Sequence, residues 1–259
     1  MERGQAGLKS MIPNSKFRKN MFIFDHEDQM LKFMLNKWED ISREGIERRG
    51  CFTAGLSGGR TPIIFYQRLA EWDSKPSWER TQFFLVDERF VSFADKDSNY
   101  RMLKETLFGK IPIPQENIHP IPTEKTSLET SAREYEEDLR RFFKVSKGQY
   151  PTFDLILLGI GEDGHTASLF PGSEALSERS HLAAAVVLDE MRHHRITLTL
   201  PVINHAEHVI FFVRGENKAF ALKKIIGGDD LSLPASMVQP RSGDLLFVID
   251  REASSQLSG

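Results

Sequence analysis

The chain of 259 residues contains a single cysteine, Cys51, and carries almost no excess charge of either sign. One cysteine excludes an internal disulfide and a cysteine-rich zinc site. The 34 basic and 37 acidic residues give a net charge of −3, so no overall field favours nucleic acid or a membrane surface. An anionic ligand would therefore have to be bound by a local cluster of cationic groups.

Long hydrophobic runs are also missing from the chain. No stretch approaches the roughly 18 consecutive apolar residues of a membrane span. Residues 1–19 are basic and have no apolar centre, which argues against a secretory signal but leaves a transit peptide open. We expect a cytoplasmic protein in which residues 1–19 form a flexible N-terminal extension and residues 20–259 form a single α/β domain.

Apolar and amphipathic segments alternate along the chain. Short apolar stretches predict strands at residues 20–24, 51–56, 82–86, 153–158, 183–188, 195–200, 208–213 and 244–249. Helical spacing predicts helices at residues 27–48, 62–72, 98–108, 127–145 and 217–226. The early alternation predicts an α/β fold with a mostly parallel, Rossmann-like sheet sandwiched by helices, and the later strands indicate a small additional β element. The proline-rich residues 111–122 predict an extended surface connection.

Residues 57–62 (Ser-Gly-Gly-Arg-Thr-Pro) join a predicted strand to a predicted helix. Thr61 is a suitable N-cap, and Pro62 suits the first helical position. The glycines can turn backbone N–H groups toward a ligand, and the helix N-terminus adds partial positive charge, a combination that suits phosphate. A tight turn without a ligand explains this loop, taken alone, equally well.

The same stretch also matches another motif, because residues 55–59 fit the G-x-S-x-G elbow of α/β-hydrolases. In such an elbow the helix begins directly after the serine. Pro62 would then lie inside the helix, where it would remove a hydrogen bond and clash with the preceding turn. We therefore disfavour Ser57 as a nucleophile.

The glycine-rich residues 159–172 directly follow the predicted strand at 153–158 and contain Asp163 and His165, two residues apart. Ligands of open α/β sheets bind at the carboxyl ends of strands. Histidine is the side chain best suited to proton transfer near neutral pH. This segment therefore predicts a proton-transfer group at the ligand-binding edge of the sheet.

Residues 87–89 (Asp-Glu-Arg) and the start of the next helix also follow a strand end. The three charges are equally consistent with two interpretations. Residues 87–89 could form the rim of a site, or they could form a solvated loop held by an Asp–Arg pair. Ser98 or Asn99 is expected to cap the helix that follows.

A further strand-to-helix junction begins at Gly215, with Asn217 as the expected helix cap. Lys218 lies at this helix start, where a positive charge opposes the helix dipole, which indicates that the lysine serves an anion. The eight histidines do not show the spacing of a metal-binding motif, so we expect no metal.

Taken together, these segments resemble the 6-phosphogluconolactonases, a family of the amino-sugar-phosphate isomerase superfamily. The resemblance covers nearly the whole chain from Asn20, and the run Asp163 to Pro171 is its most specific part. The other matching segments are residues 57–62, 86–91, 97–100, 153–162, 195–204, 215–219 and 234–236.

The resemblance implies hydrolysis of 6-phospho-D-glucono-1,5-lactone to 6-phospho-D-gluconate, in the oxidative pentose phosphate pathway, without a metal or cofactor. His165 would be the general base that activates water, Asp163 would orient His165 or position the water, and Arg89 would lie near the lactone or the phosphate. The implied substrate- and phosphate-binding residues are Ser57, Gly58, Gly59, Arg60, Thr61, Asp87, Asn99, Arg195 and Lys218.

The expected partner is a phosphorylated sugar lactone, with no nucleic acid and no membrane, and the protein is expected to be a monomer or a weak homodimer. An amino-sugar-phosphate isomerase or deaminase and a non-catalytic phosphosugar-binding protein stay open as alternatives. One segment departs from the family pattern, because residues 190–194 (Glu-Met-Arg-His-His) stand where many members have Lys-Pro-Pro. Arg192 could replace the lysine of that element.

Overall fold

The computed structural model describes residues 20–73, 77–125, 127–189, 193–228, 230 and 232–257. The predicted flexible extension at residues 1–19 lies outside these residues, as does Arg192. None of the helices in the described part of the chain combines the length and the apolar character needed to span a bilayer.

A seven-stranded parallel sheet forms the centre of the molecule, in the strand order β1-β10-β9-β6-β2-β3-β5. Its central strands β2 and β6 are buried along their whole length, as expected for a parallel sheet covered on both faces. The predicted mostly parallel sheet is therefore confirmed. The strands are β1 (Met21–Phe24), β2 (Phe52–Leu56), β3 (Thr81–Leu85), β5 (Ile118–His119), β6 (Leu155–Leu158), β9 (His208–Val213) and β10 (Asp244–Asp250).

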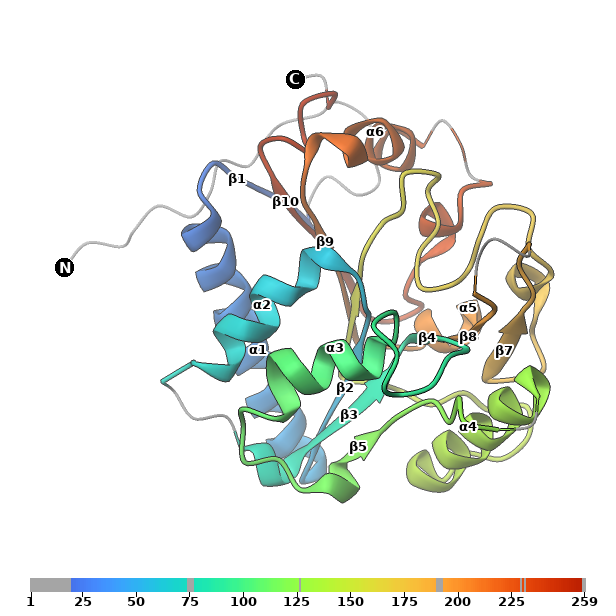
Figure 1. Cartoon of the computed structure of the whole chain (residues 1–259). Helices are drawn as coiled ribbons and strands as arrows, with labels where there is room; N and C mark the ends of the chain where they lie inside the picture. The colour runs from blue at the N-terminus through green and yellow to red at the C-terminus, as the bar shows by residue number, and fades with distance from the viewer. Residues whose placement is uncertain are drawn as a thin grey trace.

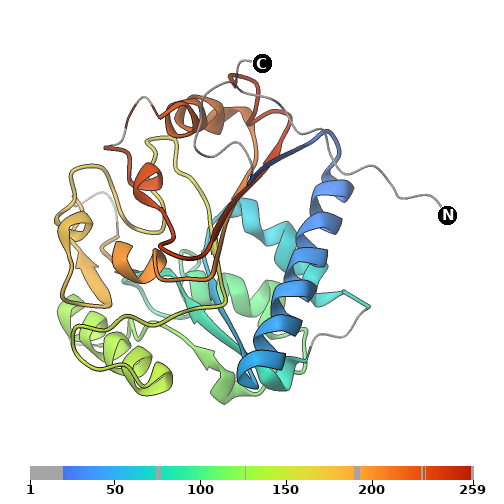
Figure 2. The ribbon, with the colours of Figure 1, turned by 180° about the vertical axis from the view of Figure 1, so that it is seen from behind.

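Helices cover both faces of this sheet, as two neighbouring residues of β3 demonstrate. Phe83 stacks on Trp38 of α1 (Glu27–Arg49), whereas Phe84 contacts Phe142 of α4 (Leu128–Phe143). Successive side chains of a strand point to opposite faces, so α1 and α4 lie on opposite sides. Figures 1 and 2 show α1 together with α2 (Arg60–Ala70) on one side of the sheet and α4 on the other. The predicted sandwich is confirmed.

A small antiparallel sheet of β4 (Asp87–Arg89), β8 (Arg195–Leu198) and β7 (Ala183–Val186) adjoins the main sheet, in the order β4-β8-β7. Val86 links the two sheets, because its N–H donates to the carbonyl of Leu56 in β2 and its own carbonyl accepts from Leu198 in β8. The small β element is confirmed. Of the two interpretations left open for residues 87–89, the solvated loop is wrong, since these residues pair with β8.

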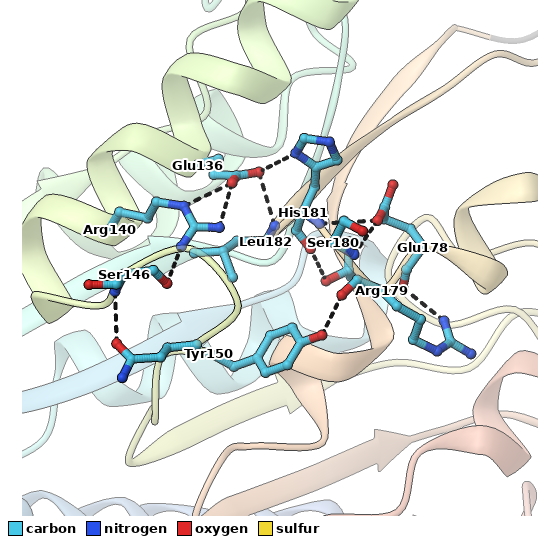
Figure 3. Close-up of polar contacts among 11 residues, drawn as sticks. Glu136, Arg140, Ser146, Tyr150, Glu178, Arg179, Ser180, His181 and Leu182 are labelled. Carbon is cyan, nitrogen blue, oxygen red and sulfur yellow. Dashed lines mark hydrogen bonds and ion pairs between the residues drawn. The ribbon is translucent and has the colours of Figure 1, made fainter.

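A polar network fixes α4 against the chain that enters β7 (Figure 3). The Glu136 carboxylate accepts hydrogen bonds from Arg140 at 2.9 and 2.7 Å and from the N–H of Leu182 at 3.0 Å. His181 Nδ1 lies 3.0 Å from the same carboxylate, and the Tyr150 hydroxyl donates to a backbone carbonyl nearby. Charge-assisted bonds of this kind are stronger than neutral ones, so they hold the small sheet and α4 together.

The start of α2 differs from the expected one. The helix begins at Arg60, two residues before Pro62, and its N-cap is Gly59 rather than Thr61. Gly59 adopts a φ of 103°, a conformation that favours glycine and turns the chain sharply into the helix. Pro62 is tolerated at the third helical position because the first four N–H groups of a helix have no intrahelical partner.

The helix near residue 217, in contrast, begins later than expected. A 3₁₀ turn (Glu216–Lys218) precedes α6 (Ala219–Gly227), and no side chain caps the helix. Asn217 does not serve as a cap, since its side-chain amide donates to Glu162 at 2.6 Å.

Two shorter regions differ from the prediction in the type of element that they form. The predicted helix at 98–108 consists of α3 (Asn99–Leu103) and a single π-helical turn (Lys104–Phe108), with Ser98 as its cap. The predicted strand at 195–200 ends at Leu198, and the short α5 (Leu200–Ile203) follows. In the proline-rich connection, the two-residue strand β5 pairs with β3 at the sheet edge.

Candidate active site

A cavity of about 480 Å³ lies at the carboxyl ends of β2, β6 and β9 and is completed by β4 and β8. The chain runs from β2 outward to β3 and β5, then returns to place β6 on the other side of β2. Loops that leave two adjacent strands in opposite directions open a crevice between them, which is where open α/β sheets bind ligands. The volume is in the range of small-molecule sites.

The structure brings the sequence-predicted site residues together around this cavity. Asp163 is the exception; it contacts His165 without lining the cavity. The predicted residues that line it are Ser57, Gly58, Gly59, Arg60, Thr61, Asp87, Arg89, Asn99, His165, Arg195 and Lys218.

The loop after β2 is held tightly by its surroundings. Ser57 is buried; its hydroxyl donates to the carbonyl of Leu157 at 2.8 Å, and its own carbonyl accepts from the Tyr66 hydroxyl at 2.8 Å. A Cβ at Gly58 would lie 1.8 Å from Oδ1 of Asn99, so only glycine fits there. The serine hydroxyl is committed to the fold, which argues against its use as a nucleophile.

His165 is oriented by Asp163. Its Nδ1 lies 2.5 Å from Oδ1 of Asp163, which also accepts the backbone N–H of His165 at 3.1 Å. Partial burial opposes ionisation of Asp163, but the interactions with His165 outweigh it and lower the pKa of Asp163. The histidine side chain is 32 % exposed and lines the cavity. With Nδ1 directed at the carboxylate, Nε2 is the ring nitrogen available to a ligand.

Cationic side chains dominate the cavity, with Asp87 as the acidic residue of its described lining. Asp87 is buried and accepts the Ser168 hydroxyl at 2.6 Å. The cationic residues are Arg60, Arg89, Arg195, Arg214 and Lys218. This is a local cluster of the kind that a chain of net charge −3 needs in order to bind an anion.

Arg214 and Asn217 also line the cavity, and neither was predicted from the sequence as a site residue. Arg214 follows β9 directly and forms ion pairs with Glu27 and, at 3.9 Å, with Asp250. Its position at a strand's carboxyl end was the available signal. Asn217 had been interpreted as a helix cap. The contact proposed for Arg192 lies outside the described residues.

The family model for glucosamine-6-phosphate isomerases and 6-phosphogluconolactonase matches residues 25–247. The chain belongs to this family. Among its relatives, a 6-phosphogluconolactonase of Synechocystis is 42 % identical over 83 % of this chain and 88 % of its own. A 6-phosphogluconolactonase of Rattus norvegicus is 40 % identical, with 81 % and 82 % of the two chains covered. The expected family relationship is thus confirmed.

Solved structures of the family have the same fold. The 6-phosphogluconolactonase of Thermotoga maritima superposes with a TM-score of 0.76 at 31 % identity, covering 89 % of this chain and 100 % of its own. The Trypanosoma brucei enzyme gives a TM-score of 0.83 at 26 % identity, with 92 % and 98 % covered. A monomeric glucosamine-6-phosphate deaminase gives 0.77 at 21 % identity over 92 % and 99 % of the two chains, which shows the shared fold alone.

Proposed function

We propose that this protein hydrolyses 6-phospho-D-glucono-1,5-lactone to 6-phospho-D-gluconate. Three curated relatives that are 40–42 % identical to this chain carry the name of that activity. The observation that carries the proposal is the placement of an Asp163-oriented His165 in the same cavity as the 57–61 loop and Lys218. One cavity thus offers a base for water and cationic groups for a phosphate.

His165 is the proposed general base. When its Nδ1–H donates to Asp163, Nε2 carries the lone pair and can take a proton from a water molecule. The resulting hydroxide attacks C1 of the lactone and forms a tetrahedral intermediate. The intermediate collapses when the C1–ring oxygen bond breaks, and the imidazolium returns its proton to the departing ring oxygen. The histidine ends in its starting state.

The cationic lining performs two further tasks in this mechanism. The backbone N–H groups of residues 58–61, at the N-terminus of α2, together with Lys218 and Arg195, bind the phosphate. A fixed phosphate holds the lactone carbonyl beside the histidine, which lowers the entropic part of the barrier. Arg89 lies at the end of β4 and stabilises the negative charge that develops on the carbonyl oxygen.

The chemistry that we propose needs no metal. The described cavity lining offers Asp87 and His165 as candidate metal ligands, and the arginines and Lys218 around them disfavour a divalent cation. Activity that survives chelation by EDTA would support this view, and its loss, restored by added Mg²⁺ or Zn²⁺, would contradict it. A cytoplasmic location and a monomeric or weakly dimeric state stay predictions from the sequence.

The test is hydrolysis of lactone that is generated freshly from glucose 6-phosphate, with the acid released at C1 followed against the spontaneous background. We expect hydrolysis in proportion to enzyme concentration, with a kcat/KM within the usual range of roughly 10⁴–10⁸ M⁻¹ s⁻¹. A rate equal to the background would overturn the proposal. Release of ammonia from glucosamine 6-phosphate in a parallel reaction would instead favour the isomerase or deaminase chemistry of the family.

A further inference from the structure

Glu88 is a completely buried acid in the middle of β4, with an exposed fraction of 0 %. Its Oε1 accepts the backbone N–H groups of Arg89 at 2.8 Å and Asn99 at 2.7 Å. Its Oε2 accepts the backbone N–H of Tyr100 at 2.7 Å and the hydroxyl of Ser98 at 3.1 Å. The carboxylate therefore joins β4 to the first turn of α3, two elements that both carry residues of the cavity.

Asn99, which Glu88 holds through its backbone, connects several parts of the cavity. Its side-chain amide donates to the backbone carbonyl of Asp87 at 2.8 Å, and its Oδ1 accepts a hydrogen bond from Nη1 of Arg89. The same Oδ1 packs against the backbone of Gly58 in the loop after β2. Moving the backbone of Asn99 would therefore move the acceptor that orients the Arg89 guanidinium.

Formation of α3 does not by itself require this buried acid. Ser98 already caps the helix, because its hydroxyl oxygen accepts the N–H of Arg101 at 3.1 Å. Burial raises the pKa of Glu88, the three backbone N–H groups oppose that rise, and the neighbouring Asp87 adds to it. A buried carboxylate is costly unless hydrogen bonds compensate it, and this one is placed where its bonds fix the residues around Arg89.

We propose that Glu88 is a positioning residue, which acts through Asn99 to direct the Arg89 guanidinium into the cavity. Glu88 does not touch the substrate, since it is fully buried and absent from the described cavity lining. The inference rests on the proposed function for the role of Arg89 at the lactone carbonyl. Glu88 would then affect turnover only through Asn99 and Arg89, without contacting the substrate itself.

The test is a double-mutant cycle of Glu88→Gln and Arg89→Ala, measured by lactone hydrolysis. Glutamine keeps the size of the side chain but places an N–H₂ group against N–H donors, which displaces the first turn of α3. We expect kcat to fall about 10- to 100-fold with KM changed less than about 3-fold. In the Arg89→Ala background the same substitution should lower kcat less than about 2-fold, because the group it positions is already absent.

Asp154→Asn is the matched control. Asp154 is also a buried acid that accepts a backbone N–H, that of Thr53 at 2.8 Å, but it lies at the amino end of β6, away from the cavity. The Asp154→Asn substitution should lower the melting temperature and leave kcat and KM unchanged. If Glu88→Gln behaves like this control, or if its loss of kcat adds fully to that of Arg89→Ala, Glu88 has a structural role only and the proposal is wrong.

Two further measurements distinguish a failure of this proposal from a variant that does not fold and from a failure of the proposed function. If Glu88→Gln does not fold, Asn99→Ala breaks the connection to Arg89 and leaves the bonds of Glu88 to the backbone in place. A fall in kcat that is absent in the Arg89→Ala background supports the proposal, and an unchanged kcat or a fall that adds fully to that of Arg89→Ala overturns it. If the wild-type protein does not hydrolyse the lactone, the proposed function fails. The cycle is then measured on binding of 6-phosphogluconate, where non-additive losses support the positioning role and additive losses refute it.

Discussion

The two ends of the central sheet use charge in opposite ways. At the amino end, Asp154 accepts the N–H and the hydroxyl of Thr53, both at 2.8 Å, and pairs with Arg48 and Arg49. Glu207 pairs with the same arginines. At the carboxyl end, Arg60 and Lys218 line the cavity, and among the described residues neither forms an ion pair. Arg214 lines the same cavity and pairs with Glu27 and Asp250. The contrast is therefore between the paired charges of the amino end and the two cations Arg60 and Lys218 at the carboxyl end.

This contrast separates stability from function within one sheet. A buried acid whose donors are all protein groups is costly to remove, because its partners are then left unpaired, and it makes no contact with a substrate. Cations without protein partners cost some stability, because they repel one another, but they bind an anion without first breaking an internal pair. Substitutions at the amino end should therefore change unfolding, and substitutions at the carboxyl end should change kinetics.

The largest expected effect is that of His165→Ala. Loss of a general base typically lowers turnover by about 10²–10⁴-fold, which corresponds to about 3–5 kcal/mol of barrier. Binding of 6-phosphogluconate should be nearly unchanged, since the phosphate contacts remain. Turnover is measured on fresh lactone and product binding by calorimetry.

His208→Ala is the matched control for this experiment. His208 begins β9 at the amino edge of the sheet and lies 3.7 Å from Asp244. Its replacement should leave kcat within about 2-fold of the wild-type value. Near-normal lactone hydrolysis by His165→Ala would show that another group activates the water.

The second effect in size concerns stability and comes from Asp154→Asn. Replacing a buried, paired carboxylate leaves Arg49 and Arg48 with a weaker partner, so we expect a loss of about 2–4 kcal/mol in the free energy of unfolding. Urea denaturation measures this loss, and the kinetics of the folded variant should match the wild type. A change in KM would contradict the separation of the two sheet ends.

The third effect comes from Lys218→Ala. A hydrogen bond to a charged group contributes about 1.5–3 kcal/mol, so removal of the ammonium should raise KM by about 10- to 100-fold with little change in kcat. Lys224→Ala is the control, since Lys224 lies on α6 and its ammonium contacts the ring of Phe220 rather than the cavity. An unchanged KM for Lys218→Ala would remove this residue from the phosphate site.

The sequence predicts the layers of this fold well because the parallel strands are buried on both faces and therefore read as uninterrupted apolar runs. It predicts helix starts less well. Thr61 and Pro62 satisfy the local rules for a cap and a first helical residue, yet Gly59 starts α2 earlier by adopting a positive φ. Local propensity cannot reveal a backbone angle that the surrounding loop selects.

The site was predictable where the loop after a strand of the main sheet carries a recognisable motif, as with the glycine-rich segment of His165 and the loop at 57–61. It was less predictable where tertiary pairing decides the role. Glu88 carries a charge next to two predicted site residues, but only the fold shows that it is buried and faces the first turn of α3. Arg214 was missed although it directly follows β9, and its ion pair with Glu27, at the start of α1, is visible only in the fold.

The smallest expected effect is the pH dependence of the stability that the Asp163–His165 pair contributes. The pKa of Asp163 is lower in the folded than in the unfolded chain, so its contribution to stability is present above the unfolded pKa of about 3.9 and is lost as the pH falls through the lowered folded pKa. The side chain is 49 % exposed, and solvent screening limits the contribution to about 1 kcal/mol or less. The stability difference between wild type and Asp163→Asn, from urea denaturation, should therefore shrink as the pH falls below about 4. A difference that persists unchanged below this pH would mean that the carboxylate is not held by His165, and the orientation of the general base would need another source.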